Sequence, residues 1–219
     1  MSTTTGLTTS QATRGKLLEA AVEVFAEKGY RDATLREICR RAGANNAAIN
    51  YHFRDKEHLY LAAIEFIVQD VHDHMPYSGD ASSSTAEVRL GRFIRGLLRD
   101  LASGRSPKRI MLITREFVEP TQGLELVAEK IAEPLLEELD SIIRGLIGPS
   151  ATDQQVFDCA ISVFGQCSEY TRGQAILSRF GPYKVLDESG IEHLAGHITR
   201  FSLAGIRAIA ASEEAGPQG

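Results

Sequence analysis

The sequence predicts an all-α protein with a small N-terminal domain and a larger C-terminal one. Over most of the 219 residues, apolar side chains recur every three or four positions, which is the period of an amphipathic helix. The alternation of apolar and polar residues that marks a half-buried strand is almost absent. Several periodic stretches also follow residues that commonly cap helices. Together these observations predict about nine helices.

The first helix is predicted from an apolar stripe that ends near Gly29. The stripe consists of Leu17, Leu18, Ala21, Val22 and Phe25, at the spacing that places side chains on one helical face. Residues 1–12 are expected to form a disordered tail. Their first part is rich in Ser and Thr and lacks the basic and apolar regions of a signal peptide.

Two short helices separated by a glycine turn are predicted next. Thr34 and Glu37 are spaced as a capping box, in which each side chain binds a backbone N–H at the helix start. Gly43 suits the left-handed residue that follows a helix, and Asn45 suits the N-cap of the next one. Residues 13–55 are therefore predicted to form a helix-turn-helix DNA-binding domain, whose second helix enters the major groove.

A fourth helix over residues 56–76 is predicted to connect the two domains, with Asp55 as its cap. Its inner side carries Leu59, Ala62, Ala63, Phe66 and Ile67. Small polar residues follow up to position 84 and form the clearest break in the chain.

Residues 84–211 are predicted to form a ligand-binding and dimerisation domain of longer helices, followed by a tail over residues 212–219. Capping boxes are expected to begin two of these helices, at Ser84 and at Thr152. Pro134 is expected to kink a long helix, because it deletes one backbone hydrogen bond.

The charge of the chain is unevenly distributed. The formal net charge is −5, but residues 1–60 carry +2 and the remainder −7. A basic end on an acidic body indicates that only the first domain meets DNA phosphates. We expect no membrane contact, because the apolar runs are too short to span a bilayer. The three cysteines lack metal-ligand spacing and are typical of the reducing cytoplasm, where we expect the protein to act.

The predicted recognition helix, residues 45–53, contains no Lys or Arg, so we expect other residues to read the bases. Asparagine can pair with adenine through two hydrogen bonds, and alanine can contact a thymine methyl group. The predicted base contacts are Asn45, Asn46, Ala47, Ala48 and Asn50. The alternative is that Asn45 only caps the helix and that Asn50 is a solvated surface residue.

Contacts to the DNA backbone are expected from the flanks of this helix. The predicted set is Thr34, Arg36, Tyr51, His52 and Lys56. Such contacts set affinity and salt dependence rather than sequence preference.

The last two long helices carry apolar and small residues around much of their circumference, which is more than one core-facing stripe needs. Either they form a central buried helix pair, or they form the interface of a homodimer in which each subunit gives two helices to a four-helix bundle. The candidate interface residues are Val163, Cys167, Leu194, Ile198, Phe201 and Gly205.

Residues 14–66 resemble the TetR family of bacterial transcriptional regulators. The matching positions are Leu18, Ala21, Phe25, Gly29-Tyr30, Thr34, Ile38, Ala42-Gly43, Tyr51-His52-Phe53 and Lys56-x-x-Leu59. Residues 45–53 are similar to the CecR-like branch of that family, as are Arg115-Glu116-x-x-Glu119-Pro120-Thr121 and Gly165-Gln166-Cys167. Two departures bear on the operator sequence rather than the fold. Many relatives have glycine or lysine at the position of Ala47, and most have alanine at that of Cys39.

The resemblance implies an all-helical homodimer whose C-terminal domain holds a small-molecule cavity, and it favours the interface interpretation of the last two helices. Ligand binding would tilt the fourth helix and spread the two DNA-reading heads, provided that the ligand prefers the spread state. With heads about one DNA turn apart, roughly 34–36 Å, the dimer would read a palindromic operator.

Candidate pocket residues are aromatic or polar side chains on otherwise inward faces of the C-terminal domain. They are Phe93, Leu97, Met111, Arg115, Phe117, Phe164 and Tyr170, and each can instead simply fill the core. Arg115 can bind a polar ligand group or form an internal ion pair with Glu116. The mostly apolar faces indicate an aromatic or lipophilic effector.

No catalytic site, cofactor site or metal site is predicted. His193 and His197 have a spacing that suits zinc on one helical face, but they lack the HExxH arrangement, and GxSxG, P-loop and dinucleotide motifs are missing. We therefore predict a ligand-responsive transcriptional regulator, a repressor that a small molecule releases from a palindromic operator, and not an enzyme. The alternative is a helical ligand-sequestering or enzymatic bundle that has kept a DNA-binding head as a remnant.

Overall fold

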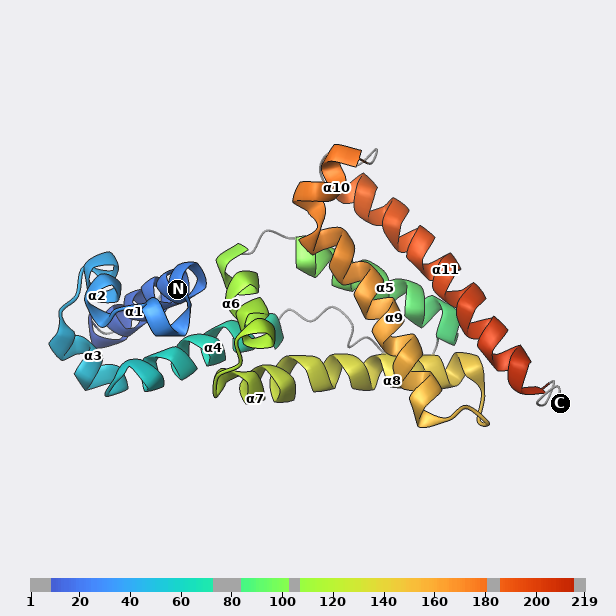
Figure 1. The fold of residues 1–219 in the computed structure, drawn as a ribbon, viewed down its shortest axis with the longest axis horizontal. Coiled ribbons are helices and arrows are strands. Elements are labelled where there is room, and N and C mark those ends of the chain that lie inside the picture. The colour runs from blue at the N-terminus through green and yellow to red at the C-terminus, as the bar shows by residue number, and fades with distance from the viewer. Residues whose placement is uncertain (1–8, 73–83, 103–106, 181–185, 215–219) are drawn as a thin grey trace, which may run out of the picture. The chain divides into compact units, whose positions relative to one another are not determined.

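A computed structural model describes residues 9–72, 84–102, 107–180 and 186–214, and the regular elements in these ranges are all helices (Figure 1). The predicted all-α class is confirmed. The helices divide into two compact units, and each unit has its own hydrophobic core. The predicted end of the connecting helix after residue 72 lies outside the described residues, as does most of the break that follows it.

The first unit contains the predicted helix-turn-helix and three later elements. Its members are α1 (Thr9–Asp32), α2 (Leu35–Ala42), α3 (Asn46–Phe53), α4 (Lys56–His72), α6 (Pro107–Val118), α7 (Gly123–Val127) and the π-helical turn η2 (Ala128–Ala132). The predicted tail over residues 1–12 is too long, because α1 begins at Thr9. α1 bends at Gly29, where φ is +75°.

The grouping of α6, α7 and η2 with the helix-turn-helix differs from the predicted domain boundary, which placed these elements in the domain of residues 84–211. α6 packs on α1 and α4, and its Leu112 is fully buried in the same core as Phe25 and Ile49. Val127 at the end of α7 joins that core as well. Amphipathic periodicity shows that a helix buries one face, but it does not show which core receives that face.

The second unit consists of α5 (Ala86–Ala102), α8 (Glu133–Ile147), α9 (Asp153–Arg172), α10 (Gln174–Phe180) and α11 (Glu188–Glu214). α5 packs against α8, α9 and α11, around a core that includes Phe93, Leu139, Val163 and Ile198. α10 was not predicted, and α11 extends three residues into the predicted C-terminal tail.

The ends of several helices follow the sequence signals. Thr152 and Gln155 form both hydrogen bonds of the predicted capping box at α9, and Asp55 accepts the N–H of His58 at 2.9 Å at the start of α4. At α5 the cap is Thr85, one residue after the predicted Ser84, because the Thr85 hydroxyl accepts the N–H of Val88.

The effect of Pro134 is visible just before it. α7, η2 and α8 follow one another without a break, and η2 is a π-helical turn over Ala128–Ala132. Proline has no N–H, and its ring crowds the carbonyl group four residues earlier. A turn with hydrogen bonds five residues apart relieves that crowding without ending the helix.

Candidate DNA-reading head

The turn between α2 and α3 depends on Gly43, whose φ of +63° lies in the left-handed region. The Gly43 N–H donates to the carbonyl oxygen of Arg40 at 3.4 Å, and the Ala44 N–H donates to that of Cys39 at 3.0 Å. These two bonds form a Schellman motif, which closes α2 and satisfies its last carbonyl groups. Gly43 thereby sets the direction in which α3 leaves α2.

The helix α3 has one buried and one exposed side. Ile49 and Phe53 are buried in the core of the first unit, and Ala48 is half-buried against the same core. The exposed side carries Asn46, Ala47, Asn50 and Tyr51. The core contacts thus hold α3 with these four side chains directed toward solvent, where a DNA groove can reach them.

Asn45 caps α3, as predicted. Its Oδ1 accepts the N–H of Ala48 at 3.0 Å, so the oxygen of its amide is already hydrogen-bonded to the helix start. The amide of the next residue, Asn46, is also held. The thiol of Cys39 in α2 donates to Asn46 Oδ1 at 3.3 Å.

The turn between α3 and α4 contains a strained residue, Arg54. Its φ and ψ are +74° and −57°, and the N–H of Asp55 reaches back to the carbonyl oxygen of Phe53 at 2.9 Å. This is the rare γ-turn with positive φ. Arg54 is exposed beside the recognition helix and was missed as a phosphate-binding candidate, although a basic residue directly after that helix was a usable signal.

Lys56 is placed by contacts inside the head. Its ammonium group donates to the carbonyl oxygen of Arg31 at 3.0 Å and lies 4.9 Å from the ring centroid of Tyr30. Partial burial lowers the pKa of Lys56. An ammonium group has three donors, so the bond to Arg31 does not prevent Lys56 from also binding a DNA phosphate. That contact stays a prediction.

Thr34 forms only half of the predicted capping box. Its hydroxyl accepts the N–H of Glu37 at 3.3 Å, but the Glu37 carboxylate binds Arg40 and Arg41 instead of the N–H of Thr34. The other predicted backbone contacts lie on the surface or near it. Arg36 is exposed, the Tyr51 side chain is 79% exposed, and His52 is half-buried.

A cluster of charges joins α2 to α1 and α6. Arg41 lies 2.6 Å from Glu27 and 3.0 Å from Glu37, and Lys108 lies 2.7 Å from Glu27. Hydrogen bonds from Arg41 and Lys108 lower the pKa of Glu27 to about 2. Hydrogen bonds from Arg40 and Arg41 lower the pKa of Glu37 to about 2.

Arg115, a predicted pocket residue, caps α1 instead. Its Nε donates to the carbonyl oxygen of Ala26 at 2.9 Å, and its Nη2 donates to that of Glu27 at 3.2 Å. A Cβ atom at Gly29 would lie 3.2 Å from the Arg115 guanidinium, so glycine leaves room for this contact. The cation stabilises the C-terminal carbonyl groups of the first part of α1.

Glu116 is fully buried and is not paired with Arg115. Its carboxylate accepts hydrogen bonds from the hydroxyl of Tyr60 in α4 and from the N–H and hydroxyl of Thr121, at 3.0 Å each. Burial and the Glu116 carboxylate raise the pKa of Tyr60. The internal Arg115–Glu116 pair considered from the sequence is therefore wrong.

The other predicted pocket residues do not gather in one place. Phe93 and Leu97 are buried in the core of the second unit, and Phe164 and Tyr170 pack half-buried against that core. The remaining two, Met111 and Phe117, belong to α6 in the first unit and are 48% and 57% exposed. Neither faces a core, because the buried side of α6 is formed by Leu112 and Glu116.

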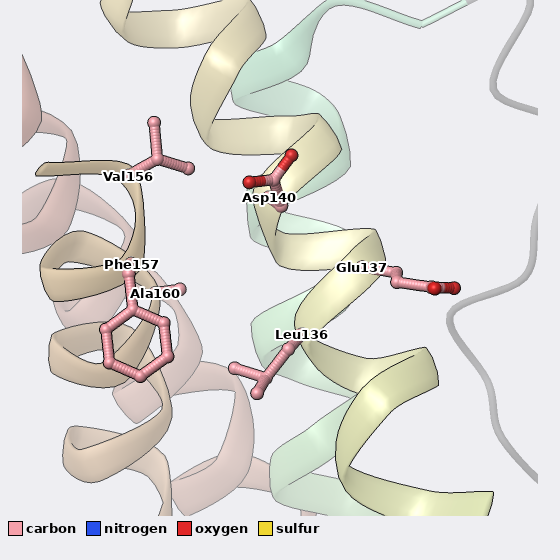
Figure 2. A pocket seen from close by; sticks show the side chains of 6 residues that line it. All are labelled: Leu136, Glu137, Asp140, Val156, Phe157 and Ala160. Carbon is pink, nitrogen blue, oxygen red and sulfur yellow. The ribbon is translucent and has the colours of Figure 1, made fainter. Parts of the chain in front are cut away.

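An open pocket of about 310 Å³ lies between α8 and α9 (Figure 2). It is lined by Leu136, Glu137, Asp140, Val156, Phe157 and Ala160. In Figure 2 the Glu137 carboxylate points away from α9, which leaves mostly apolar groups between the two helices. None of the predicted pocket residues lines it.

Four of the six predicted interface residues are unsuited to that role. Val163, Cys167, Leu194 and Ile198 are at most 2% exposed, because their side chains already fill the core of the second unit. Phe201 is 64% exposed and Gly205 is also exposed. Two exposed apolar residues on α9 were missed, Phe157 and Ile161, at 51% and 43% exposure. We call Phe157, Ile161, Phe201 and Gly205 the exposed apolar positions of α9 and α11. Phe157 also lines the pocket between α8 and α9.

Comparison with protein families bears on both units. A model described as bacterial regulatory proteins of the tetR family matches residues 17–63. A second, described as the C-terminal domain of the HTH-type transcriptional dual regulator CecR, matches residues 86–206. The chain belongs to the TetR family. It is a DNA-binding transcription regulator, and α2 and α3 are its helix-turn-helix.

Individual relatives of this TetR-family chain agree with that assignment. The chain is similar to the HTH-type transcriptional dual regulator CecR of Shigella flexneri, with 29% identity over 84% of this chain and 86% of that protein. It is also similar to the HTH-type transcriptional repressor NicS of Pseudomonas putida, with 24% identity over 93% of this chain and 97% of that protein. A solved structure of AibR in complex with isovaleryl coenzyme A and operator DNA shares the fold, with a TM-score of 0.63 and 15% identity. The match covers 86% of this chain and 97% of that chain.

The described residues meet neither the requirements for a metal site nor those for a membrane-spanning helix. Within the described ranges, no group of three or more His, Cys, Asp or Glu side chains is arranged to hold a metal ion. The helices in those same ranges also include none that is long and apolar enough to cross a bilayer.

Proposed function

We propose that this TetR-family regulator is a homodimer that represses transcription at a palindromic operator and releases it when a small molecule binds. The observation that carries the proposal is the exposed side of α3, which presents Asn46, Ala47, Asn50 and Tyr51 on a capped helix whose other side is buried. A helix held in this way presents amide and methyl groups that fit base edges in the major groove. The NicS relative, named a repressor, supports the proposed sign of regulation.

The proposed contacts divide into those with the bases and those with the DNA backbone. Asn46, Ala47 and Asn50 read bases, since they share the exposed side. Asn45 contributes to this reading through the part of its amide that the cap leaves free, whereas Ala48 is turned toward the core and is set aside. The DNA backbone is bound by Thr34, Arg36, Tyr51, His52, Lys56 and, as an addition, Arg54.

The exposed apolar positions of α9 and α11 form the proposed homodimer surface. Exposed phenylalanine and isoleucine side chains favour burial at a protein interface, and Gly205 leaves open space around its Cα. A Gln166 amide and the Ser202 hydroxyl are 3.3 Å apart, which joins α9 to α11 within one subunit. Two such helix pairs form a four-helix bundle.

The effector is proposed to be lipophilic or aromatic and to bind in the second unit, where Phe164 and Tyr170 are half-buried against an apolar core. The solved AibR complex contains isovaleryl coenzyme A, which makes short acyl-CoA thioesters the first class to test. A ligand releases DNA only to the extent that it binds the released state more tightly.

The decisive experiment is selection of double-stranded DNA from a random pool by the purified full-length chain. We expect a palindromic site to be enriched, and anisotropy titrations should then show binding that weakens linearly in log–log plots against salt. Addition of an effector should release the selected DNA. If no sequence binds better than random DNA even at low salt, the regulator proposal fails and a remnant head becomes the better description.

Single substitutions separate the two classes of DNA contact. Tyr51→Phe and Lys56→Ala should weaken binding to every DNA sequence by a similar factor, because phosphate contacts carry no sequence information. Asn46→Ala should instead change which operator is preferred. Equal losses on all sequences for Asn46→Ala would assign that residue to the DNA backbone.

A further inference from the structure

Asn46 and Cys39 are hydrogen-bonded to each other across the turn of the helix-turn-helix. Cys39 is 5% exposed on the inner side of α2, and Asn46 is exposed as the first residue of α3. The Cys39 Sγ donates to the Asn46 Oδ1 at 3.3 Å. The bond therefore joins a core residue to a side chain on the DNA-facing side.

The direction of this hydrogen bond determines how the amide of Asn46 is turned. Burial raises the pKa of Cys39, so the thiol keeps its proton and is available as a donor. A thiol donor requires the amide oxygen rather than the amide nitrogen as its partner. With Oδ1 bonded to the Cys39 thiol, the NH₂ group is the part of the exposed Asn46 amide that this bond does not use.

Hydrogen bonds in the turn fix the backbone positions of Cys39 and Asn46 relative to each other. The carbonyl oxygen of Cys39 accepts the N–H of Ala44 in the Schellman motif, and Asn45 caps α3 directly before Asn46. On either side of Gly43, the backbone next to each partner is thus held by a hydrogen bond, one from the Ala44 N–H to the carbonyl oxygen of Cys39 and one from the Ala48 N–H to the Asn45 side chain. The thiol bond adds orientation to a side chain whose backbone is already placed.

We propose that Cys39 is a positioning residue that orients Asn46 as a hydrogen-bond donor toward DNA, so that Asn46 selects a base edge rich in acceptors. In the major groove guanine offers two acceptors, N7 and O6, and thymine offers O4. Cytosine presents a donor there, and the two-bond pairing with adenine requires the amide oxygen as well as the nitrogen. The preferred partner of Asn46 is therefore guanine, and cytosine is the base that it rejects. This inference rests on the proposed DNA-reading role of α3.

The test compares Cys39→Ser and Cys39→Ala with the unaltered chain, each as the full-length protein. Serine keeps a hydrogen-bond donor at this position, whereas alanine removes it and frees the amide to turn. Binding is measured by anisotropy on the selected operator and on variants in which one symmetric pair of positions carries each of the four base pairs. Asn46→Ala identifies that pair as the one whose preference disappears.

We expect the unaltered chain and Cys39→Ser to prefer guanine over cytosine by roughly ten-fold or more at that pair. Cys39→Ala should lose most of this preference and gain affinity for adenine. Its binding to random DNA and its urea unfolding midpoint should match those of the unaltered chain, which checks that the fold is intact. If Cys39→Ala keeps the base preference of the unaltered chain, or if that chain prefers adenine there, the inference is wrong. A chain that selects no operator at all would instead overturn the proposed function.

Discussion

Arg54 carries an unfavourable backbone conformation at a position that joins the recognition helix to α4. Within the described part of the chain it is the one residue other than glycine with a positive φ. Such conformations cost of the order of 1–3 kcal/mol and persist where the surrounding structure imposes them. Here the imposing elements are Phe53, which is buried, and Asp55, which caps α4.

Replacement of Arg54 by glycine should therefore stabilise the protein. Glycine adopts positive φ without steric cost but loses more entropy on folding, so we expect a net gain of about 1 kcal/mol in the free energy of unfolding, measured with urea. Arg54→Ala is the matched control, since it also removes the guanidinium but keeps the strain. Equal stability of the two variants would argue against strain at this turn.

The buried carboxylate of Glu116 depends on neutral donors. Tyr60→Phe removes one of them and leaves the Glu116 oxygen short of a partner, which should lower the free energy of unfolding by about 1–3 kcal/mol. Tyr51→Phe, which alters an exposed tyrosine, should leave stability unchanged. A stability loss for Tyr60→Phe no greater than that of Tyr51→Phe would mean that water or a shifted Thr121 replaces the lost donor.

At the scale of helices, the start of an element was more predictable than its partners. Caps at Asn45, Asp55 and Thr152 were correct because a capping side chain acts on backbone within three residues. The association of α6 with the head was not predictable, because it depends on Leu112 meeting a core formed by residues far away in sequence. Arg115 was misassigned for the same reason, since its partners are carbonyl groups of α1.

The charge cluster between α1, α2 and α6 should make stability depend on acid pH. The pKa of Glu27 and that of Glu37 are lowered from 4.5 to about 2. Their contribution is therefore complete above about pH 4.5 and is lost as the pH falls toward 2. We expect the urea midpoint to fall across this window, and to fall less steeply in the double variant Glu27→Gln/Glu37→Gln.

Exposed glutamates on the same unit provide the control for this pH dependence. The double variant Glu19→Gln/Glu65→Gln removes the same number of carboxylates at exposed positions and should follow the unaltered chain. If both double variants flatten the pH profile equally, the effect comes from net charge and not from the cluster.

For the whole molecule, burial changes which residues are available to a second subunit. The sequence predicts α9 and α11 for the proposed interface, but periodicity alone could not separate the core side of these helices from the exposed side. Both sides of these helices are apolar, and Val163 and Ile198 turned out to face inward. The exposed positions Phe157 and Ile161 became identifiable only from the packing of the second unit.

Phe201→Asp should shift the protein from dimer to monomer, because a carboxylate in an apolar interface is desolvated without a partner. Sedimentation velocity measures the shift, and operator affinity should fall with it. Phe180→Asp is the matched control, since Phe180 is 84% exposed on α10 and is not one of the proposed interface positions. A dimer that survives Phe201→Asp would place the interface elsewhere.

The inclusion of α6, α7 and η2 in the head's core affects how regulators of this kind can be recombined. A hybrid that takes its operator preference from this chain and its sensing part from a relative needs two separate pieces of this sequence, residues 9–72 and 107–132. A single cut after α4 would strip the cap from α1 and the carboxylate partner from Tyr60. The first unit is therefore not one consecutive block of the chain, and a gene fusion that joins a relative directly after α4 would yield a first unit with an open core.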